Sequence, residues 1–188
     1  MRNWMLTGLL ATLTAGPALA GERFAIDPNH TLPMFEVSHL GFSTQIGRFD
    51  RTSGTIELDR EKKTGTVRFS IAADSINMGQ AKWDDHMKSE DFFNAAKFPT
   101  ITYSSDVIRF EGDKPVAAEG QLTLLGVTRP VSLKIERFTC GVNPIVKKDL
   151  CAADIVTTLK RSEFGMSKYL PGISDEVRVR VPVEAYRE

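Results

Sequence analysis

The chain has 188 residues and carries 24 lysines and arginines against 24 aspartates and glutamates, so its formal net charge is zero. This balance argues against a nucleic-acid partner, because such proteins need a clustered excess of basic side chains. An apolar fraction of 41% is ordinary for a folded domain and argues against intrinsic disorder. The length fits one domain with a core of useful size.

The first twenty residues have the features of a secretory signal peptide. Arg2 supplies a positive charge, residues 5–15 form a short apolar run, and residues 18–20 form an A-x-A cleavage pattern. The run is shorter than the roughly 20 residues that a membrane-spanning helix needs. We therefore expect cleavage after Ala20, a periplasmic location without stable membrane insertion, and a single mature domain of residues 21–188.

The expected export determines how the two cysteines are interpreted. Cys140 and Cys151 would enter an oxidising compartment, where disulfides form and persist. Gly141, Asn143 and Pro144 lie between them, so we interpret the segment as a long loop that a disulfide clamps between two strands. A metal pair and a redox pair are the alternatives, but neither has the close C-x-x-C spacing that would support it.

Most of the remaining chain alternates apolar and polar residues with a period of two, which is typical of half-buried antiparallel strands. Val67, Phe69 and Ile71, for example, share one face. Evenly spaced short strands favour a closed all-β barrel or a sandwich. Alternation and turn signals predict strands near residues 23–26, 31–39, 46–59, 65–74, 100–110, 115–126, 130–139, 152–162 and 174–187.

Residues 79–94 break this pattern. Trp83 and Met87 fall at helical spacing, and a second turn with a polar N-cap-like start carries Phe92 and Phe93. We predict a short helical segment inserted into the otherwise all-β chain.

The sequence contains none of the familiar catalytic motifs, such as G-x-S-x-G, a phosphate-binding loop or H-E-x-x-H. Asp84, Asp85 and His86 are adjacent, but adjacent residues on a helix point in different directions. We interpret them as a solvated helix surface with one inward histidine, and we expect no catalytic residue.

Three histidines, His30, His39 and His86, are the candidates for an imidazole metal site. They come from separate elements, so their spacing says nothing about convergence. His39 would share a strand face with Phe35 and Val37, and a histidine on an apolar face is more often a hydrogen-bonded core residue. We expect no metal site and no cofactor.

Aromatic side chains are spread over many of the predicted elements. A packed core is the simplest interpretation, but a closed sheet of about eight strands is also able to enclose a ligand. The residue pattern leaves open whether the interior is filled or hollow. These side chains are Phe35, Phe49, Phe69, Phe92, Phe93, Tyr103 and Phe164.

Several motifs together resemble the YceI-like family, which comprises exported lipocalin-like barrels associated with the binding of polyisoprenoids and other lipids. The resemblance covers essentially the whole mature chain and rests on the order and spacing of its parts. The matching segments are residues 27–30 (DPNH), 35–41 (FEVSHLG), 47–49 (GRF), 53–56 (SGTI), 83–89 (WDDHMKS), 91–93 (DFF), 98–101 (FPTI), 120–131 (GQLTLLGVTRPV), 161–166 (RSEFGM) and 173–177 (ISDEV).

The sequence departs from the family pattern at four positions. Thr31 follows the first histidine, where serine is usual, and Pro33 stands where a β-branched residue is common. Trp83 replaces an arginine or asparagine, and Met87 replaces a leucine. Trp83 would narrow or reshape one end of a cavity, so these departures bear on the ligand rather than on the fold.

The resemblance implies an eight-stranded antiparallel lipocalin-like β-barrel with an elongated apolar cavity and with residues 79–94 at its margin. It implies a non-enzymatic carrier, monomeric or homodimeric, whose partner is a long-chain isoprenoid or a fatty-acid-like lipid. Each buried methylene of such a chain gains about 0.8 kcal/mol. The expected ligand-binding residues are Phe35, Val37, His39, Phe49, Phe69, Ile71, Trp83, His86, Phe92, Phe93, Tyr103, Leu122, Leu124, Leu133, Arg161 and Phe164.

Within this set, different side chains have different expected roles. Phe92, Phe93 and Phe164 would close the ends of the cavity. The candidate donors to a polar head group are His39, His86, Tyr103 and Arg161. For Arg161, a buried ion pair or an anchor between strand and loop is the alternative.

Three other functions stay open at this point. The first is an enzyme acting on a hydrophobic substrate, for which only Asp85, His86, Tyr103 and Arg161 are candidate residues. The second is a metal- or haem-associated accessory protein of electron transfer, because families of this kind occur beside membrane electron-transfer proteins. The third is a packed structural protein without a ligand.

Overall fold

A computed structural model describes residues 21–188, so the expected signal peptide lies outside the described residues. These residues form one sheet of eleven strands with three short helices. The strands are β1 (Glu22–Ile26), β2 (Met34–His39), β3 (Ser43–Phe49), β4 (Thr52–Asp59), β5 (Thr64–Ala72), β6 (Ile76–Asn77), β7 (Thr100–Glu111), β8 (Lys114–Leu124), β9 (Val127–Val142), β10 (Asp149–Lys160) and β11 (Ile173–Arg187). The helices are η1 (Ala73–Ser75), α1 (Ala81–Lys88) and η2 (Arg161–Phe164).

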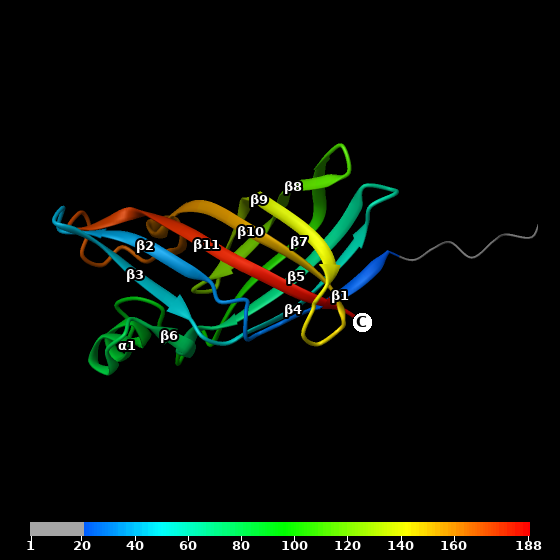
Figure 1. Cartoon of the computed structure of the whole chain (residues 1–188). Helices are drawn as coiled ribbons and strands as arrows, with labels where there is room; N and C mark the ends of the chain where they lie inside the picture. Colours follow the sequence, from blue (N-terminus) through cyan, green and yellow to red (C-terminus); the bar gives the residue numbers. More distant parts are fainter. Residues whose placement is uncertain (1–20) are drawn as a thin grey trace, which may run out of the picture.

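Eight of the strands close an antiparallel barrel in the order β1-β4-β5-β7-β8-β9-β10-β11, and β1 pairs with β11 to complete the ring. Strands β2, β3 and β6 continue the sheet from β11. In Figure 1 the barrel is elongated, with α1 near one end and β1 near the other. We call these the mouth end and the lower end. The prediction of an eight-stranded antiparallel barrel is confirmed, and the sandwich alternative is wrong.

Alternation along each strand places apolar side chains inside the barrel and polar ones outside. In β7, Ile101, Tyr103 and Ser105 are buried, while Thr102 and Ser104 between them are exposed. The hydroxyl of Ser105 lies 2.7 Å from the carbonyl oxygen of Glu119, so this buried polar group has a partner. The period of two read from the sequence therefore fixes which side chains line the interior.

The prediction of one strand over residues 46–59 is wrong. β3 ends at Phe49 and β4 begins at Thr52, and the two strands have different neighbours in the sheet. Between them, the N–H groups of Asp50 and Arg51 both donate to Ser75, to its carbonyl oxygen and its hydroxyl respectively. Asp50 and Arg51 are both exposed between the buried Phe49 and Thr52, so the alternation shifts by one residue at the break.

The strand predicted for residues 31–39 begins three residues later, at Met34. Thr31 is fully buried, and its hydroxyl donates to the carbonyl oxygen of Glu184 in β11. Its own carbonyl oxygen accepts the Thr52 hydroxyl at 2.8 Å. Thr31 therefore stabilises the connection between β1 and β2 against two other strands.

The short helix predicted within residues 79–94 is confirmed as α1, which is followed by a non-helical turn. Met87 is its buried residue, whereas the side chain of His86 is 45% exposed. The expectation of an inward histidine on this helix is therefore wrong, and Met87 takes that position. No helix in residues 21–188 has the length and apolar character needed to cross a bilayer.

The predicted disulfide between Cys140 and Cys151 is present, but it does not clamp a long loop. β9 and β10 extend past both cysteines, which are directly opposite each other in the strand register with Cα atoms 4.1 Å apart. The disulfide thus fixes the β9–β10 hairpin next to its connecting loop, at the lower end of the barrel.

We predict that the Cys140→Ala/Cys151→Ala double variant folds to the same barrel with reduced stability. A closed loop of this size contributes about 3 kcal/mol in the chain-entropy model. For a domain of this length, that corresponds to a fall in Tm of roughly 6–12 °C. Thermal unfolding followed by circular dichroism measures the difference, and the wild type with reductant is the control. Superimposable wild-type curves with and without reductant would contradict the prediction.

Candidate ligand-binding site

Three cavities lie in a row along the barrel. The mouth chamber, beside α1, has a volume of about 390 Å³; the middle chamber has about 160 Å³ and the lower chamber about 110 Å³. Phe35, Val37 and Phe92 line both the mouth chamber and the middle chamber. Phe69 and Tyr103 line both the middle chamber and the lower chamber. Only single layers of side chains therefore separate neighbouring chambers, and the interior is hollow rather than filled.

The middle chamber offers an almost purely apolar surface. Tyr103, Thr157 and Arg161 are the only polar residues in its lining, and each donates to a backbone carbonyl oxygen. The Tyr103 hydroxyl lies 2.9 Å from the carbonyl oxygen of Ala118 and 3.1 Å from that of Val131. Burial raises the pKa of Tyr103 far above its usual value, which keeps the phenol protonated. The chamber therefore suits a hydrocarbon chain and not a charged group.

Arg161 anchors the loop that follows η2. Its guanidinium donates to four carbonyl oxygens, those of Met166, Lys168, Ile173 and Ser174, at distances of 2.8 to 2.9 Å. Burial lowers the pKa of the guanidinium. The structure thus supports the anchor between strand and loop rather than a buried ion pair, and the donors of Arg161 are already engaged.

Asp175, the nearby carboxylate, bonds to Ser162 instead of forming a direct salt bridge. Its two oxygens accept the backbone N–H and the hydroxyl of Ser162 at 2.9 and 2.8 Å. These hydrogen bonds lower the pKa of Asp175, and the charge of Arg161 contributes further. Asp175 therefore compensates the buried arginine at longer range while it fixes the start of η2.

We predict that Arg161→Met destabilises the protein by about 3 kcal/mol or more, because it leaves several buried carbonyl oxygens without donors. Arg161→Lys should be destabilised less, since an ammonium group still bonds some of these oxygens. Urea unfolding of the three proteins measures the order. Equal stability of the methionine variant and the wild type would contradict the anchor role.

A cluster of side chains joins the turn after α1 to the loop after η2 across the mouth. The Tyr169 hydroxyl donates to Asp91 Oδ2 at 2.8 Å, and His86 Nε2 lies 3.3 Å from the same oxygen. Lys168 Nζ lies 3.5 Å from Asp91 Oδ1. The Phe92 ring packs against those of His86 and Tyr169, with centroids 5.1 and 5.8 Å apart. We call His86, Asp91 and Tyr169 the mouth clasp.

The clasp shifts the ionisation of its members. The hydrogen bond from Tyr169, followed by that from His86, lowers the pKa of Asp91 although partial burial opposes the shift. The same hydrogen bond raises the pKa of Tyr169. A carboxyl group with a lowered pKa contributes stability above its unfolded-state pKa of about 3.9, and this contribution is lost as the pH falls through the lower folded-state value.

We therefore predict that acid loosens the mouth. Amide hydrogen exchange in residues 165–172 should be slow at pH 5 and faster, relative to intrinsic rates, below pH 3. Tyr169→Phe should exchange severalfold faster already at pH 5, because one of the hydrogen bonds to Asp91 is gone. Identical protection of this loop in the variant and the wild type would show that the clasp does not hold it.

Each side chain expected from the sequence to contact a ligand lines one of the three chambers. Their role in ligand binding stays a prediction. His39, Trp83 and His86 line the mouth chamber. Tyr103 and Arg161 face the middle chamber, but their donors are engaged by carbonyl oxygens. The middle chamber is lined by Phe35, Val37, Phe49, Phe69, Ile71, Phe92, Phe93, Leu122, Leu124, Leu133 and Phe164.

Sequence reasoning missed the contribution of β11 and the whole lower chamber. Val177, Val179 and Val181 line the middle chamber, and their alternation with Arg178 and Arg180 was visible in the sequence. The signal that identified Leu122 and Leu124 would have identified them too. The lower chamber is lined by residues that include Phe24, Ile26, Ile56, Leu58, Ile108, Phe138 and Val183.

The acidic and histidine residues of α1 have separate partners. Asp84 accepts the N–H of Met78 at 2.6 Å, and Asp85 lies 3.5 Å from Lys88. His86 contacts Asp91. The interpretation that these three adjacent residues do not act together is consistent with this geometry.

The three histidines do not gather at one place. His39 and His86 line the mouth chamber, whereas His30 lies beside Asp27 and Glu184. Within residues 21–188, that trio is the one group of at least three histidine, cysteine or acidic residues whose ligand atoms all lie within 4.8 Å of one another. His30 Nδ1 is 2.7 Å from Asp27 Oδ2, and this hydrogen bond raises the pKa of His30. The contact orders the turn between β1 and β2.

These features define the class of protein: a small closed antiparallel β-barrel with a row of largely apolar internal cavities. The model of the YceI-like domain matches residues 24–185. A UPF0312 protein of Pseudomonas aeruginosa (strain LESB58) is 33% identical over 193 residues, covering 98% of this chain and the whole relative. Protein YceI of Salmonella arizonae is 32% identical with both chains fully covered. This chain belongs to the YceI-like family.

Solved structures of distant relatives share the fold. BcnA of Burkholderia cenocepacia superposes with a TM-score of 0.74 at 21% identity, covering 85% of this chain and 98% of BcnA. A polyisoprenoid binding domain from Saccharophagus degradans, implicated in plant cell wall breakdown, superposes with a TM-score of 0.66 at 17% identity, covering 88% and 98%. At these identities the likeness concerns the fold alone.

Proposed function

We propose that this protein is a carrier that holds one long-chain lipid, of the isoprenoid or fatty-acid type, inside its barrel. The observation that carries the proposal is the row of three chambers, whose middle and lower members have apolar walls. Burial of an apolar chain in such a cavity is favourable by about 25 cal/mol per Å² of apolar surface. The protein would act by binding, without a cofactor and without chemical change of the lipid.

The distribution of polar groups supports an amphiphile bound tail first. No side-chain nitrogen or oxygen atom buried among the described residues lacks a hydrogen-bond partner, so the deep interior holds no unengaged donor for a head group. Further polar side chains lie at the mouth, where His39, Gln45 and His86 line the outermost chamber. A head group would stay there, while the tail would extend toward the lower end.

A structure with the same fold and the disulfide both support the proposed carrier function. The Saccharophagus degradans domain with this fold is named for polyisoprenoid binding, which supports an isoprenoid as the ligand here. The disulfide between Cys140 and Cys151 suits an oxidising compartment. Together with the signal-peptide features of residues 1–20, it supports a periplasmic carrier, monomeric or homodimeric.

We predict that affinity rises with chain length until the lower chamber is filled. Each added methylene should tighten binding by up to about fourfold, which corresponds to 0.8 kcal/mol. Titration of a series of isoprenoid alcohols, followed by native mass spectrometry, gives the length at which affinity stops rising. Failure of every chain length to bind would refute the carrier function.

A matched pair of variants tests where the tail lies. Val181 lines both the middle and the lower chamber, and its neighbour Arg180 points outward. Val181→Phe should obstruct the passage, so affinity should stop rising at a shorter chain. Arg180→Phe adds the same ring outside and should keep the wild-type profile. An unchanged profile in Val181→Phe would place the tail elsewhere.

A further inference from the structure

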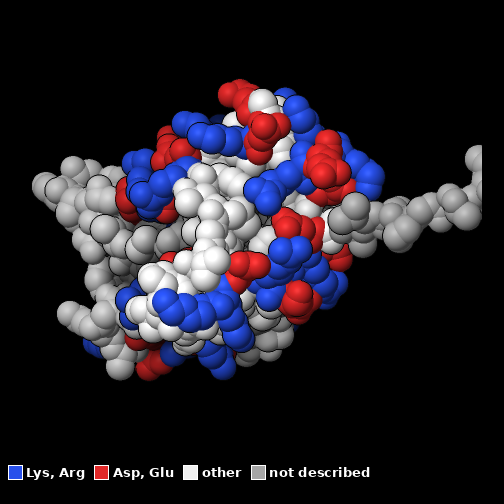
Figure 2. All heavy atoms as spheres, turned by 45° about the vertical axis from the view of Figure 1, so that its right-hand side comes forward, with Lys and Arg blue, Asp and Glu red and all other residues white. Residues whose placement is uncertain are grey.

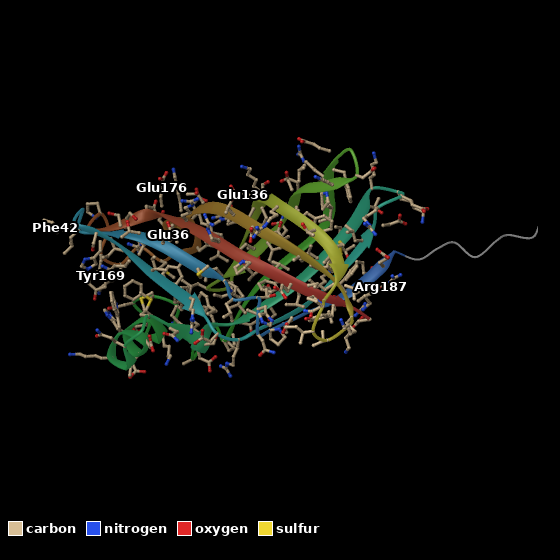
Figure 3. The ribbon with its side chains drawn as sticks, viewed as in Figure 1. Glu36, Phe42, Glu136, Tyr169, Glu176 and Arg187 are labelled. Atoms are coloured by element: carbon tan, nitrogen blue, oxygen red, sulfur yellow. A yellow bond between two sulfur atoms is a disulfide. The ribbon has the colours of Figure 1, made fainter. Side chains whose placement is uncertain are left out.

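Large apolar side chains are exposed at the mouth end of the barrel. Phe42 is 91% exposed at the turn between β2 and β3, and Leu40 and Ile46 beside it are more than half exposed. Tyr169 and Leu170, on the loop after η2, are also exposed. Figure 3 shows Phe42 at the extreme end of the molecule with Tyr169 close behind it. We call these five residues the apolar tip.

The two segments that carry the tip are joined to each other. The N–H of Leu40 donates to the carbonyl oxygen of Gly172 at 2.6 Å, and Ile173 pairs with His39 in the sheet. Leu40 and Gly41 have left-handed backbone conformations, with φ of 52° and 72°, which make the turn tight. The mouth clasp and Arg161 fix the other segment. The exposed apolar surface is therefore a built feature and not a loose loop.

The tip also lacks charge. Residues 37–47 and 169–174 contain no lysine, arginine, aspartate or glutamate, although such residues make up 26% of the chain. Asp91, the acidic member of the nearby clasp, already has Tyr169, His86 and Lys168 as partners. Other surfaces differ, since Figure 2 shows basic and acidic side chains intermixed over the barrel. An uncharged apolar end in such a chain is suited to contact with lipid.

The tip is continuous with the cavity. Leu40 and Tyr169 belong to the tip and also line the mouth chamber. We propose that the mouth end docks on the surface of a lipid bilayer, with Phe42 inserted among the lipids. The proposal rests on the carrier function, because docking would let a lipid tail pass between the bilayer and the barrel through the mouth chamber.

A bilayer fits this surface better than a protein partner does. A stable protein–protein interface buries about 800 Å² on each partner, which requires a broad complementary face. Here the apolar groups stand on two narrow connected segments that protrude from the end of a barrel. Aromatic and aliphatic side chains on such a projection insert readily at the boundary between head groups and acyl chains.

Vesicle partitioning with a matched control tests the proposal. Phosphatidylcholine vesicles are pelleted with the wild type, with Phe42→Ser, and with Ile145→Ser. Ile145 is 85% exposed on the β9–β10 hairpin at the opposite end. Loss of one buried phenyl ring should weaken partitioning about tenfold or more, whereas Ile145→Ser should bind as the wild type does. Absence of wild-type partitioning, or equal effects of the two variants, would overturn the proposal.

Two further measurements separate docking from carrier function. Titration with a solubilised isoprenoid alcohol, without vesicles, should give equal affinities for Phe42→Ser and the wild type, because Phe42 lies outside the chambers. If the wild type binds vesicles but no isoprenoid, the carrier function fails while docking stands. Sedimentation tests whether the apolar tip binds a second copy of the chain instead of a bilayer. A wild-type dimer that Phe42→Ser converts to a monomer would overturn bilayer docking in favour of self-association.

Discussion

Strand β11 pairs with three partners along its 15 residues, and the barrel depends on this division. One edge bonds to β10 over nearly the whole length, from Glu176 to Tyr186. The other edge bonds to β1 only at residues 185–187, and then to β2 from residue 180 to residue 173. The short pairing with β1 closes the ring at the lower end. Toward the mouth, β2 replaces β1 as the neighbour of β11.

This exchange of neighbours gives the two ends different characters. At the lower end, Phe24, Ile26, Leu58, Val183 and Ala185 form a second apolar cluster, and the disulfide fixes the hairpin beside it. At the mouth, the wall continues as β2, β3 and the short β6, with α1 alongside. The mouth is held by side-chain and backbone hydrogen bonds from Asp91, Tyr169 and Arg161 rather than by a complete ring of strands. For the proposed carrier, it is therefore the end at which a ligand would enter with the least disruption of the sheet.

Local pattern was sufficient to predict most of the fold. Alternation identified the inner faces of β5 and β8, because a strand with one apolar face has only one side that it is able to bury. The prediction failed at Asp50 and Arg51, two polar residues in a row that shift the alternation where the sheet partner changes. The break is held by Ser75, a residue distant in sequence that accepts both N–H groups, and this contact has no local sequence signal. Cys140 and Cys151 were paired correctly because they are the only two cysteines in the sequence and the expected export would place them in an oxidising compartment.

The candidate site was harder to predict than the fold, because it consists of cavities. Phe69, Leu122 and Leu133 have the pattern of core residues, and only the closed ring shows that they face cavities instead of complete packing. For Arg161 the sequence left both a head-group donor and a structural anchor open, because it does not show the four carbonyl oxygens that the loop after η2 brings to this side chain. Polar side chains were thus the hardest to interpret, since their partners are set by tertiary structure, whereas apolar ones need only the correct face.

Because the polar groups of the interior are already hydrogen-bonded to the backbone, they limit how the barrel could select among ligands. A cavity that recognises a ligand by hydrogen bonds rejects analogues strongly, because unpaired buried donors are costly. In this barrel, Tyr103, Thr157 and Arg161 are satisfied by the backbone before any ligand enters. An analogue of the tail therefore leaves no donor in the middle chamber unpaired. In the proposed carrier, discrimination would come from the length and shape of the chain and from contacts at the mouth, where His39, Gln45 and Trp83 line the outer chamber. The proposed function would therefore favour a broad set of lipids with similar tails over a single compound.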